Sequence, residues 1–223
     1  MDLSKSYDFF KPEMCRERIH IIGCGAIGST VAENLARFGL TKITLYDFDK
    51  VEAHNIANQM FTQDDIGKMK VEAVAEYLLK INPEMKDDLI LMPKGYINQR
   101  LSGYVFLCVD NIDLRREIAK SCVGNPFIKG MFDFRMRLTD AQHYAAAWND
   151  EKMVDSFLKS MAFSHEEAKK ETPVSACNIT LSVAPTVRMI VAAGVSNFIN
   201  FAKGGQLRKL ILADAFSYSI DAF

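Results

Sequence analysis

The sequence predicts an α/β fold, a doubly wound Rossmann-like sheet that is mainly parallel, with antiparallel additions toward the C-terminus. Three observations lead to this class. A strand, a tight glycine turn, a helix and a second strand follow one another in the first 47 residues, and apolar strands then alternate with amphipathic helices. With 223 residues and 49% hydrophobic content the chain can bury one substantial core, so we expect residues 1–223 to form a single domain.

The first predicted unit runs from residue 18 to residue 47. The apolar run "RIHII" ends at a glycine, and the segment that begins at Ile27 has apolar residues at helical spacing and stops at Gly39. "KITLYD", residues 42–47, has the composition of a buried strand. Two strands joined by a helix in this way are expected to be parallel, with a right-handed crossover.

The rest of the chain continues this alternation. A helix is predicted over residues 70–82, where Pro83 stops it, and another over residues 112–123. Pro185 suits the first turn of a last long helix that reaches about Ala202. Apolar runs predict strands at residues 89–92, 104–109, 126–134 and 141–147, and an edge strand at residues 207–214.

Residues 149–172 differ from the rest of the chain because they are polar and charged. We expect a mobile segment or lid there, with Ser164 and Glu167 forming the capping box of a short helix. The longest apolar tract, Leu181–Phe201, is interrupted by Arg188 and by several polar residues, so no membrane span is expected.

Composition excludes several classes of function. Lysine and arginine number 27 against 28 acidic residues, a net charge of -1, so no nucleic-acid partner is expected. The five cysteines include no Cys-x-x-Cys pair, which argues against a disulfide framework and against a structural zinc site. Reduced thiols, together with an opening segment that lacks the apolar core of a secretory signal, favour a cytoplasmic protein.

A glycine-rich turn predicts a nucleotide site. Gly23, Gly25 and Gly28 form G-x-G-x-x-G directly after a predicted strand and at the start of a helix, a context in which backbone N–H groups approach phosphate oxygens. Asp47 lies near the roughly 20-residue offset at which an acidic residue reaches ribose hydroxyls. The glycines could instead serve only close packing of strand and helix. The turn and Asp47 fit NAD and ATP equally well.

Three further segments separate these cofactors by resemblance. "DFDKVEAHNIANQ" at residues 47–59 resembles the D-x-D-x-V-x-x-x-N-x-x-R-Q element of the ThiF/MoeB adenylyltransferases, the superfamily that includes ubiquitin-activating enzymes. "GKMK" at residues 67–70 resembles their G-x-x-K, and "DNIDLR" at residues 110–115 resembles their D-N-x-x-x-R. The motifs also occur in the family's order, and the resemblance covers about half of the chain.

The resemblance implies roles for individual residues. Asp110 is the family's magnesium-binding acid, Lys70 neutralises phosphate charge, and Asn55 contacts the phosphates or the waters of the metal. Asp47 and Asp49 face the ribose and its surroundings. The residues assigned to the nucleotide are Gly23, Gly25, Ala26, Ile27, Gly28, Asp47, Asp49, Asn58, Gln59, Lys70, Asn111 and Arg115.

Several of these residues have a structural alternative. Asp49 and Asn55 could satisfy only loop backbone, and Lys70 alone would be a solvated helix residue. Asn111 could cap the following helix, and Arg115 could pair with acidic neighbours on its own helix.

The chain departs from the family at its arginines. Asn58 stands where many members have arginine, and the N-terminus has no R-Y-x-R-Q element, so either another cation substitutes or adenylation is weak. Arg16, Arg18 and Arg135 are candidates for that cation. Cys177 lies near where several members place a cysteine, and it could carry the acyl group as a thioester or be a buried small hydrophobe.

The sequence therefore predicts an adenylyltransferase that uses ATP and Mg²⁺ to activate the C-terminal carboxylate of a small ubiquitin-like or sulfur-carrier protein ending in Gly-Gly. One alternative is a non-catalytic nucleotide-binding or scaffold subunit, and a weaker one is an NAD-dependent oxidoreductase. A homodimer is expected, because residues 181–201 are apolar around much of a helix and a partner subunit could supply the missing arginine. Apolar residues that support an interface are Met189, Ile190, Val195, Phe198 and Phe201.

Overall fold

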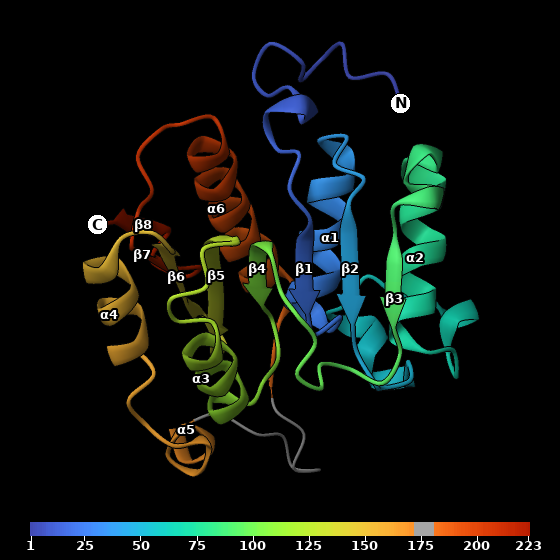
Figure 1. Cartoon of the computed structure of the whole chain (residues 1–223). Coiled ribbons are helices and arrows are strands. Elements are labelled where there is room, and N and C mark those ends of the chain that lie inside the picture. Colours follow the sequence, from blue (N-terminus) through green and yellow to red (C-terminus); the bar gives the residue numbers. More distant parts are fainter. Residues whose placement is uncertain (172–180) are drawn as a thin grey trace.

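The computed structural model describes residues 1–171 and 181–223. Within this part of the chain the strands form one 8-stranded sheet in the order β3-β2-β1-β4-β5-β6-β7-β8 (Figure 1). The strands are β1 Ile19–Ile22, β2 Ile43–Tyr46, β3 Ile90–Met92, β4 Gly103–Leu107, β5 Ile128–Met136, β6 Asp140–Ala147, β7 Leu210–Asp214 and β8 Ser219–Ala222. The α-helices are α1 Ala26–Arg37, α2 Lys70–Ile81, α3 Ile112–Ser121, α4 Glu151–Lys159, α5 His165–Glu171 and α6 Ala184–Ala202.

The sheet confirms the predicted fold class. Strands β3, β2, β1, β4 and β5 pair in parallel, and β6, β7 and β8 add antiparallel pairs on one side. The chain order reverses between β1 and β4, where Ile22 pairs with Leu107. Open α/β sheets bind ligands outside the carboxyl ends of the strands at such a switch point. This edge is the lower one in Figure 1.

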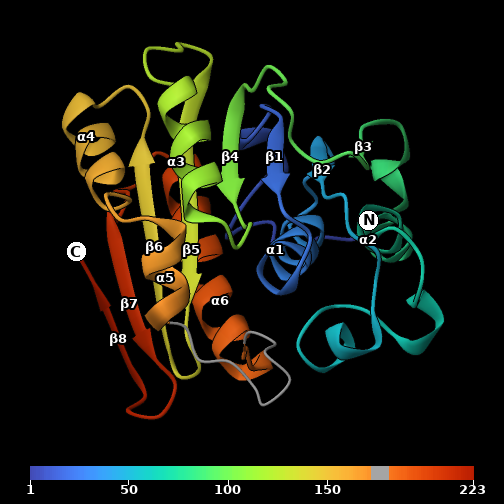
Figure 2. The same ribbon diagram turned by 90° about the horizontal axis from the view of Figure 1, so that it is seen from below.

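The helices cover the sheet in two layers (Figure 2). Helices α1, α2 and α6 pack on one face, and α3, α4 and α5 pack on the other. Buried rings of Phe106, Phe132 and Phe198 fill the first layer, and Trp148 packs edge-on against Phe157 in the second. Burial of each such ring contributes roughly 1.5–3 kcal/mol to folding.

Helix α6 corrects one expectation. Ile190, Val195 and Phe198 are buried, and the helix packs against α1, β5 and β6 of its own domain. Pro185 lies in its first turn, as predicted. Ile190, Val195 and Phe198 therefore serve the core of the domain and not a dimer interface, whereas Met189 and Phe201 are half-buried.

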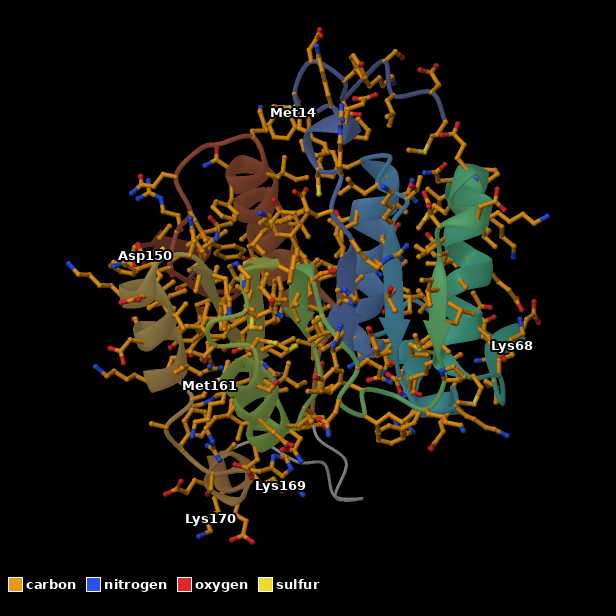
Figure 3. The ribbon with its side chains drawn as sticks, in the orientation of Figure 1. Met14, Lys68, Asp150, Met161, Lys169 and Lys170 are labelled. Carbon is orange, nitrogen blue, oxygen red and sulfur yellow. The ribbon has the colours of Figure 1, made fainter. Side chains whose placement is uncertain are left out.

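Residues 149–171 contain two helices, α4 and α5, where the sequence predicted one short helix within a mobile segment or lid. Asp150 caps α4 by accepting hydrogen bonds from the N–H groups of Lys152 and Met153, and Val154 and Phe157 are buried under the helix. Figure 3 shows Asp150 and Met161 at the two ends of this packed element. The predicted capping box of Ser164 and Glu167 is confirmed at the start of α5.

The C-terminal hairpin was predicted in part. Strand β7 occurs where residues 207–214 predicted an edge strand, but β8 pairs with its outer side and forms the edge itself. All residues of β8 are exposed, so it shows no alternation of buried and exposed positions. Among the residues that the structure describes, no helix combines the length and apolarity needed to cross a membrane.

Candidate functional site

The glycine turn joins β1 to α1 at the carboxyl edge of the sheet. Gly23 has a φ of +96°, and a Cβ there would lie 2.8 Å from the backbone of Cys108. A Cβ on Gly28 would lie 1.8 Å from the carbonyl oxygen of Gly23. These two glycines are therefore required by packing alone.

Gly25 differs from both. It is the N-cap residue of α1, and among the described residues a Cβ there would meet only Gln59 Oε1, at 3.9 Å. The protein thus leaves space in front of Gly25, where the first N–H groups of α1 and the positive end of the helix dipole favour an anion. Ala26 and Ile27 begin this helix.

Asp47, directly after β2, holds the glycine turn in place. One carboxylate oxygen accepts from the Cys24 N–H at 2.7 Å and the other from the Asp49 N–H at 2.9 Å. Burial raises the pKa of Asp47, although these two hydrogen bonds and the charge of Lys70 oppose the shift. Each oxygen keeps a lone pair with which it can accept a ligand hydroxyl.

Lys70 is the first residue of α2, and its side chain is largely buried. Its Nζ lies 2.8 Å from Asp49 Oδ2, and its backbone N–H donates to the Asp49 carbonyl. The structure therefore brings together two predicted residues from separate motifs. Lys70 is not a solvated helix residue.

The polar loop between β2 and α2 is tied down by its asparagines. Asn55 is buried, and its Oδ1 accepts from the Glu52 N–H at 2.9 Å. Asn58 Nδ2 donates to the Ser182 carbonyl at 3.3 Å and so links the loop to the start of α6. Both side chains therefore make a hydrogen bond to the backbone of the protein. For Asn55 this agrees with the alternative that its side chain satisfies loop backbone.

Gln59 provides an independent indication of a ligand. Its Oε1 is buried, faces Gly25, and has no hydrogen-bond partner among the described residues. Buried polar atoms of native proteins are nearly always paired, so an unpaired oxygen beside an open glycine indicates a partner from outside the described residues.

Asp110 and Asn111 follow β4, across the switch point from the glycine turn. Asn111 caps α3, because its Oδ1 accepts from the N–H groups of Asp113 and Leu114 at 2.9 and 3.1 Å. The exposed carboxylate of Asp110 has no hydrogen bond or ion pair with any described residue. A free carboxylate at this edge is the donor that Mg²⁺ favours beside phosphate oxygens.

Arg115 faces the interior of the protein. Its guanidinium group donates to the Val109 and Phe134 carbonyls and forms a 2.5 Å ion pair with Asp133, which is fully buried. Its partner is thus neither Asp113 nor Glu117, the neighbours considered from the sequence.

The other candidate arginines also have partners within the protein. Arg18 donates to the Asp88 carbonyl, and Arg16 to the Glu13 carbonyl. Both lie at the amino ends of the strands, and Figure 3 shows Met14, beside them in sequence, at the edge opposite Lys68. Arg135 lies at the correct edge but pairs with Asp133 at 2.6 Å.

Burial raises the pKa of each described cysteine thiol. Burial raises the pKa of Cys15 to about 12 and that of Cys24 well above its usual range. No group of three or more His, Cys, Asp or Glu suited to a metal is found in residues 1–171 and 181–223. Cys177 lies outside the described residues.

Phe48 was not identified from the sequence. Its side chain is 70% exposed between Asp47 and Asp49, and its ring lies 3.0 Å from where a Cβ on Gly95 would be. An exposed ring at this edge of the sheet suits the face of a flat apolar ligand group.

A model of the ThiF family matches residues 13–220. Ubiquitin-like modifier-activating enzyme 5 of Drosophila persimilis is 31% identical over 138 residues, which cover 55% of this chain and 35% of that protein. The protein of the same name from Caenorhabditis elegans is 31% identical over 126 residues, covering 49% and 30%. The chain spans about a third of the length of these curated relatives.

Two solved structures show the same fold. Escherichia coli MccB, solved with ATP, superimposes with a TM-score of 0.75 at 20% identity, over 95% of this chain and 65% of that one. PaaA superimposes with a TM-score of 0.66 at 18% identity, over 100% and 68% of the two chains.

Proposed function

This chain belongs to the ThiF family, and from that premise we propose that it is an adenylyltransferase that uses ATP and Mg²⁺ to activate the C-terminal carboxylate of a small ubiquitin-like or sulfur-carrier protein ending in Gly-Gly. One observation carries the proposal. The open N-terminus of α1 at Gly25 lies at the switch-point edge with a buried lysine from the G-x-x-K motif and a free carboxylate at Asp110.

The described side chains suggest how ATP binds. Phosphate oxygens take the space in front of Gly25, where they accept from the first N–H groups of α1, and the unpaired Gln59 Oε1 accepts from a hydrogen-bond donor of the ligand. A ribose hydroxyl donates to Asp47, and the exposed ring of Phe48 supports the base. Lys70 turns from Asp49 toward the phosphates, because a phosphate carries more charge than one carboxylate.

Asp110 would hold Mg²⁺, because it offers an exposed carboxylate without a protein partner beside the phosphate site. When bound, the ion neutralises charge on the phosphates and on the leaving pyrophosphate. Asp49 lies on the other side of the site and becomes free to accept further hydrogen bonds once Lys70 leaves it.

The proposed reaction requires positioning more than acid or base chemistry. A carboxylate oxygen of the acceptor attacks the α-phosphorus, an O–P bond forms, the bond to the β-phosphate oxygen breaks, and pyrophosphate leaves with that electron pair. The acceptor is already ionised, so no proton has to be removed. The contribution of the chain is to hold both reactants and to stabilise charge.

The relatives support a protein acceptor. Relatives that match include ubiquitin-like modifier-activating enzyme 5 of several species, and MccB structures contain ATP in one case and MccA with AMPCPP in another. Family membership also removes the main reason to consider NAD, since the polar loop and the G-x-x-K motif are the family's own. The unpaired thiols of the described cysteines agree with the cytoplasmic site that we propose.

Asn58 favours a second candidate, a non-catalytic nucleotide-binding subunit. It occupies the arginine position of the motif and donates to the Ser182 carbonyl, and two arginines at this edge, Arg115 and Arg135, are held by Asp133. A homodimer would resolve the shortage of charge, because a second copy could supply an arginine in trans. We therefore retain the homodimer as part of the proposal.

ATP–pyrophosphate exchange tests the proposal. The chain is incubated with Mg²⁺, ATP, labelled pyrophosphate and small ubiquitin-fold proteins that end in Gly-Gly. Label entering ATP only when an acceptor with a free C-terminal carboxylate is present supports adenylation. ATP binding without exchange for any acceptor would favour the non-catalytic subunit.

A further inference from the structure

Asp133 is the centre of a buried charged network. It lies on β5, its side chain is 0% exposed, and each carboxylate oxygen receives one guanidinium group. Arg115 reaches Oδ1 at 2.5 Å and Arg135 Nε reaches Oδ2 at 2.6 Å. A buried carboxylate without such partners is costly, so the three side chains hold one another in a single arrangement.

One arm of the network reaches the turn before Asp110. Arg115 Nε donates to the Val109 carbonyl at 2.6 Å, and Nη1 donates to the Phe134 carbonyl at 2.5 Å. Val109 directly precedes Asp110. Because the Asp110 carboxylate has no partner among the described residues, its direction depends on the backbone of this turn.

The other arm reaches the end of α4. Arg135 Nη1 donates to the Ser160 carbonyl at 2.7 Å, Nη2 donates to Ser160 Oγ at 2.9 Å, and the guanidinium lies 4.3 Å from the centre of the Tyr144 ring. Ser160 begins the connection from α4 to α5, beside Met161 (Figure 3). The network therefore joins this connection to the turn that carries Asp110.

We propose that Asp133 is a positioning residue for Asp110, acting through Arg115 and the Val109 carbonyl. The inference rests on the proposed function, in which Asp110 holds Mg²⁺. Without the charge of Asp133, Arg115 loses its ion-pair partner and is no longer confined to Val109, so the turn gains freedom. Gly25 and Lys70 lie outside the network, and ATP without metal should bind as before.

The test is the gain in ATP affinity that Mg²⁺ produces, measured by calorimetry with and without MgCl₂ and without any acceptor protein. Asp133→Asn keeps the shape and removes the charge. Loss of a residue that orients a metal ligand typically costs about 10-fold to 100-fold in metal affinity, so we expect the Mg²⁺-dependent gain to fall by about 10-fold. ATP affinity in the absence of Mg²⁺ should stay within about twofold, because those contacts are made elsewhere.

Two further variants keep the test decisive. Arg115→Lys retains the charge but lacks the guanidinium group that contacts both Asp133 and the Val109 carbonyl. It should show the same loss of the Mg²⁺-dependent gain in ATP affinity, even if Asp133→Asn does not fold. Arg116→Gln is the matched control, because Arg116 binds the Met161 and Phe163 carbonyls of the same connection without contacting Asp133. It should keep the full gain.

The outcomes separate this inference from the function on which it rests. An unchanged Mg²⁺-dependent gain in Asp133→Asn and Arg115→Lys would overturn the positioning role, as would an equal loss in Arg116→Gln. A wild-type chain whose ATP affinity does not respond to Mg²⁺ would refute the proposed metal site itself.

Discussion

Lys70 Nζ lies 2.8 Å from Asp49 Oδ2, and this ion pair joins the two motifs that flank the polar loop. Lys70 is nearly buried, whereas the Asp49 side chain is half exposed. The lysine is thus held at the edge of the glycine turn before any nucleotide arrives. A phosphate that binds there competes with Asp49 for the same ammonium group.

Lys70→Ala should weaken ATP binding more than AMP binding. The variant removes the cation proposed for the outer phosphates and leaves the Asp49 carboxylate uncompensated beside them. Calorimetry with both nucleotides measures the difference. Lys68→Ala is the control, since Lys68 pairs with Asp65 and Glu76 outside the site. Equal losses for ATP and AMP would remove Lys70 from the phosphate site.

Gly28→Ala should mainly lower stability, whereas Gly25→Ala should mainly lower the affinity for ATP. The new methyl group at Gly28 would clash with the Gly23 carbonyl at 1.8 Å, so we expect a loss of stability of about 1–3 kcal/mol or more. At Gly25 it meets only Gln59, so the melting temperature should change little while ATP binding falls at least about 10-fold, as a lost phosphate contact would predict. Intact ATP binding in Gly25→Ala would contradict the proposed phosphate position.

Asp110→Asn should abolish most Mg²⁺-dependent pyrophosphate exchange while leaving the fold intact, because Asp110 is exposed and supports no packing. Circular dichroism and the melting temperature check the fold. Glu117→Gln, an exposed position on α3, should keep full exchange. Normal exchange by Asp110→Asn would end its assignment to the metal.

Stability should decrease as pH falls from about 6.5 toward 4. Burial lowers the pKa of His20 and of His143 to about 4, so the unfolded chain binds protons in this range that the folded chain does not. The contribution is complete above pH 6.5, and each histidine reduces stability by up to about 1.4 kcal/mol per pH unit below it. Urea unfolding at pH 7 and pH 5 measures the change. His20→Gln should reduce the difference between the two pH values, and an unaltered difference would contradict the assignment.

A homodimer is expected in solution, because Arg115 and Arg135 at the site edge are already bound by Asp133 and a second copy could supply a further arginine. Light scattering at micromolar concentration should report a mass near twice the 25.1 kDa chain. A strict monomer with and without ATP would refute the idea of an arginine supplied by a second copy.

Most elements with regular apolar spacing were predictable from the sequence. Helix α4 is an exception, because its N-cap Asp150 and the helical spacing of Val154 and Phe157 lie within a strongly polar and charged segment. Strand β8 has no buried residue, so no pattern marks it. It exists because β7 offers a free edge.

The site was predictable as a set of residues but not as an arrangement. The motif treats its three glycines alike, and only the geometry separates Gly25 from those required by packing. Arg115 has two acidic neighbours on its own helix, yet its partner is Asp133 on a strand. Such a pair depends on tertiary packing, which local spacing does not reveal.

The most direct test of the central claim is the intact mass of an acceptor protein after incubation with the chain, Mg²⁺ and ATP. The proposed function predicts an AMP adduct on an acceptor that ends in a free Gly-Gly carboxylate, and none on the same acceptor with its C-terminus amidated or when Asp110→Asn replaces the wild type. Consumption of ATP that leaves every free-carboxylate acceptor unmodified, in the presence of neutral hydroxylamine to trap an activated carboxylate, would contradict it.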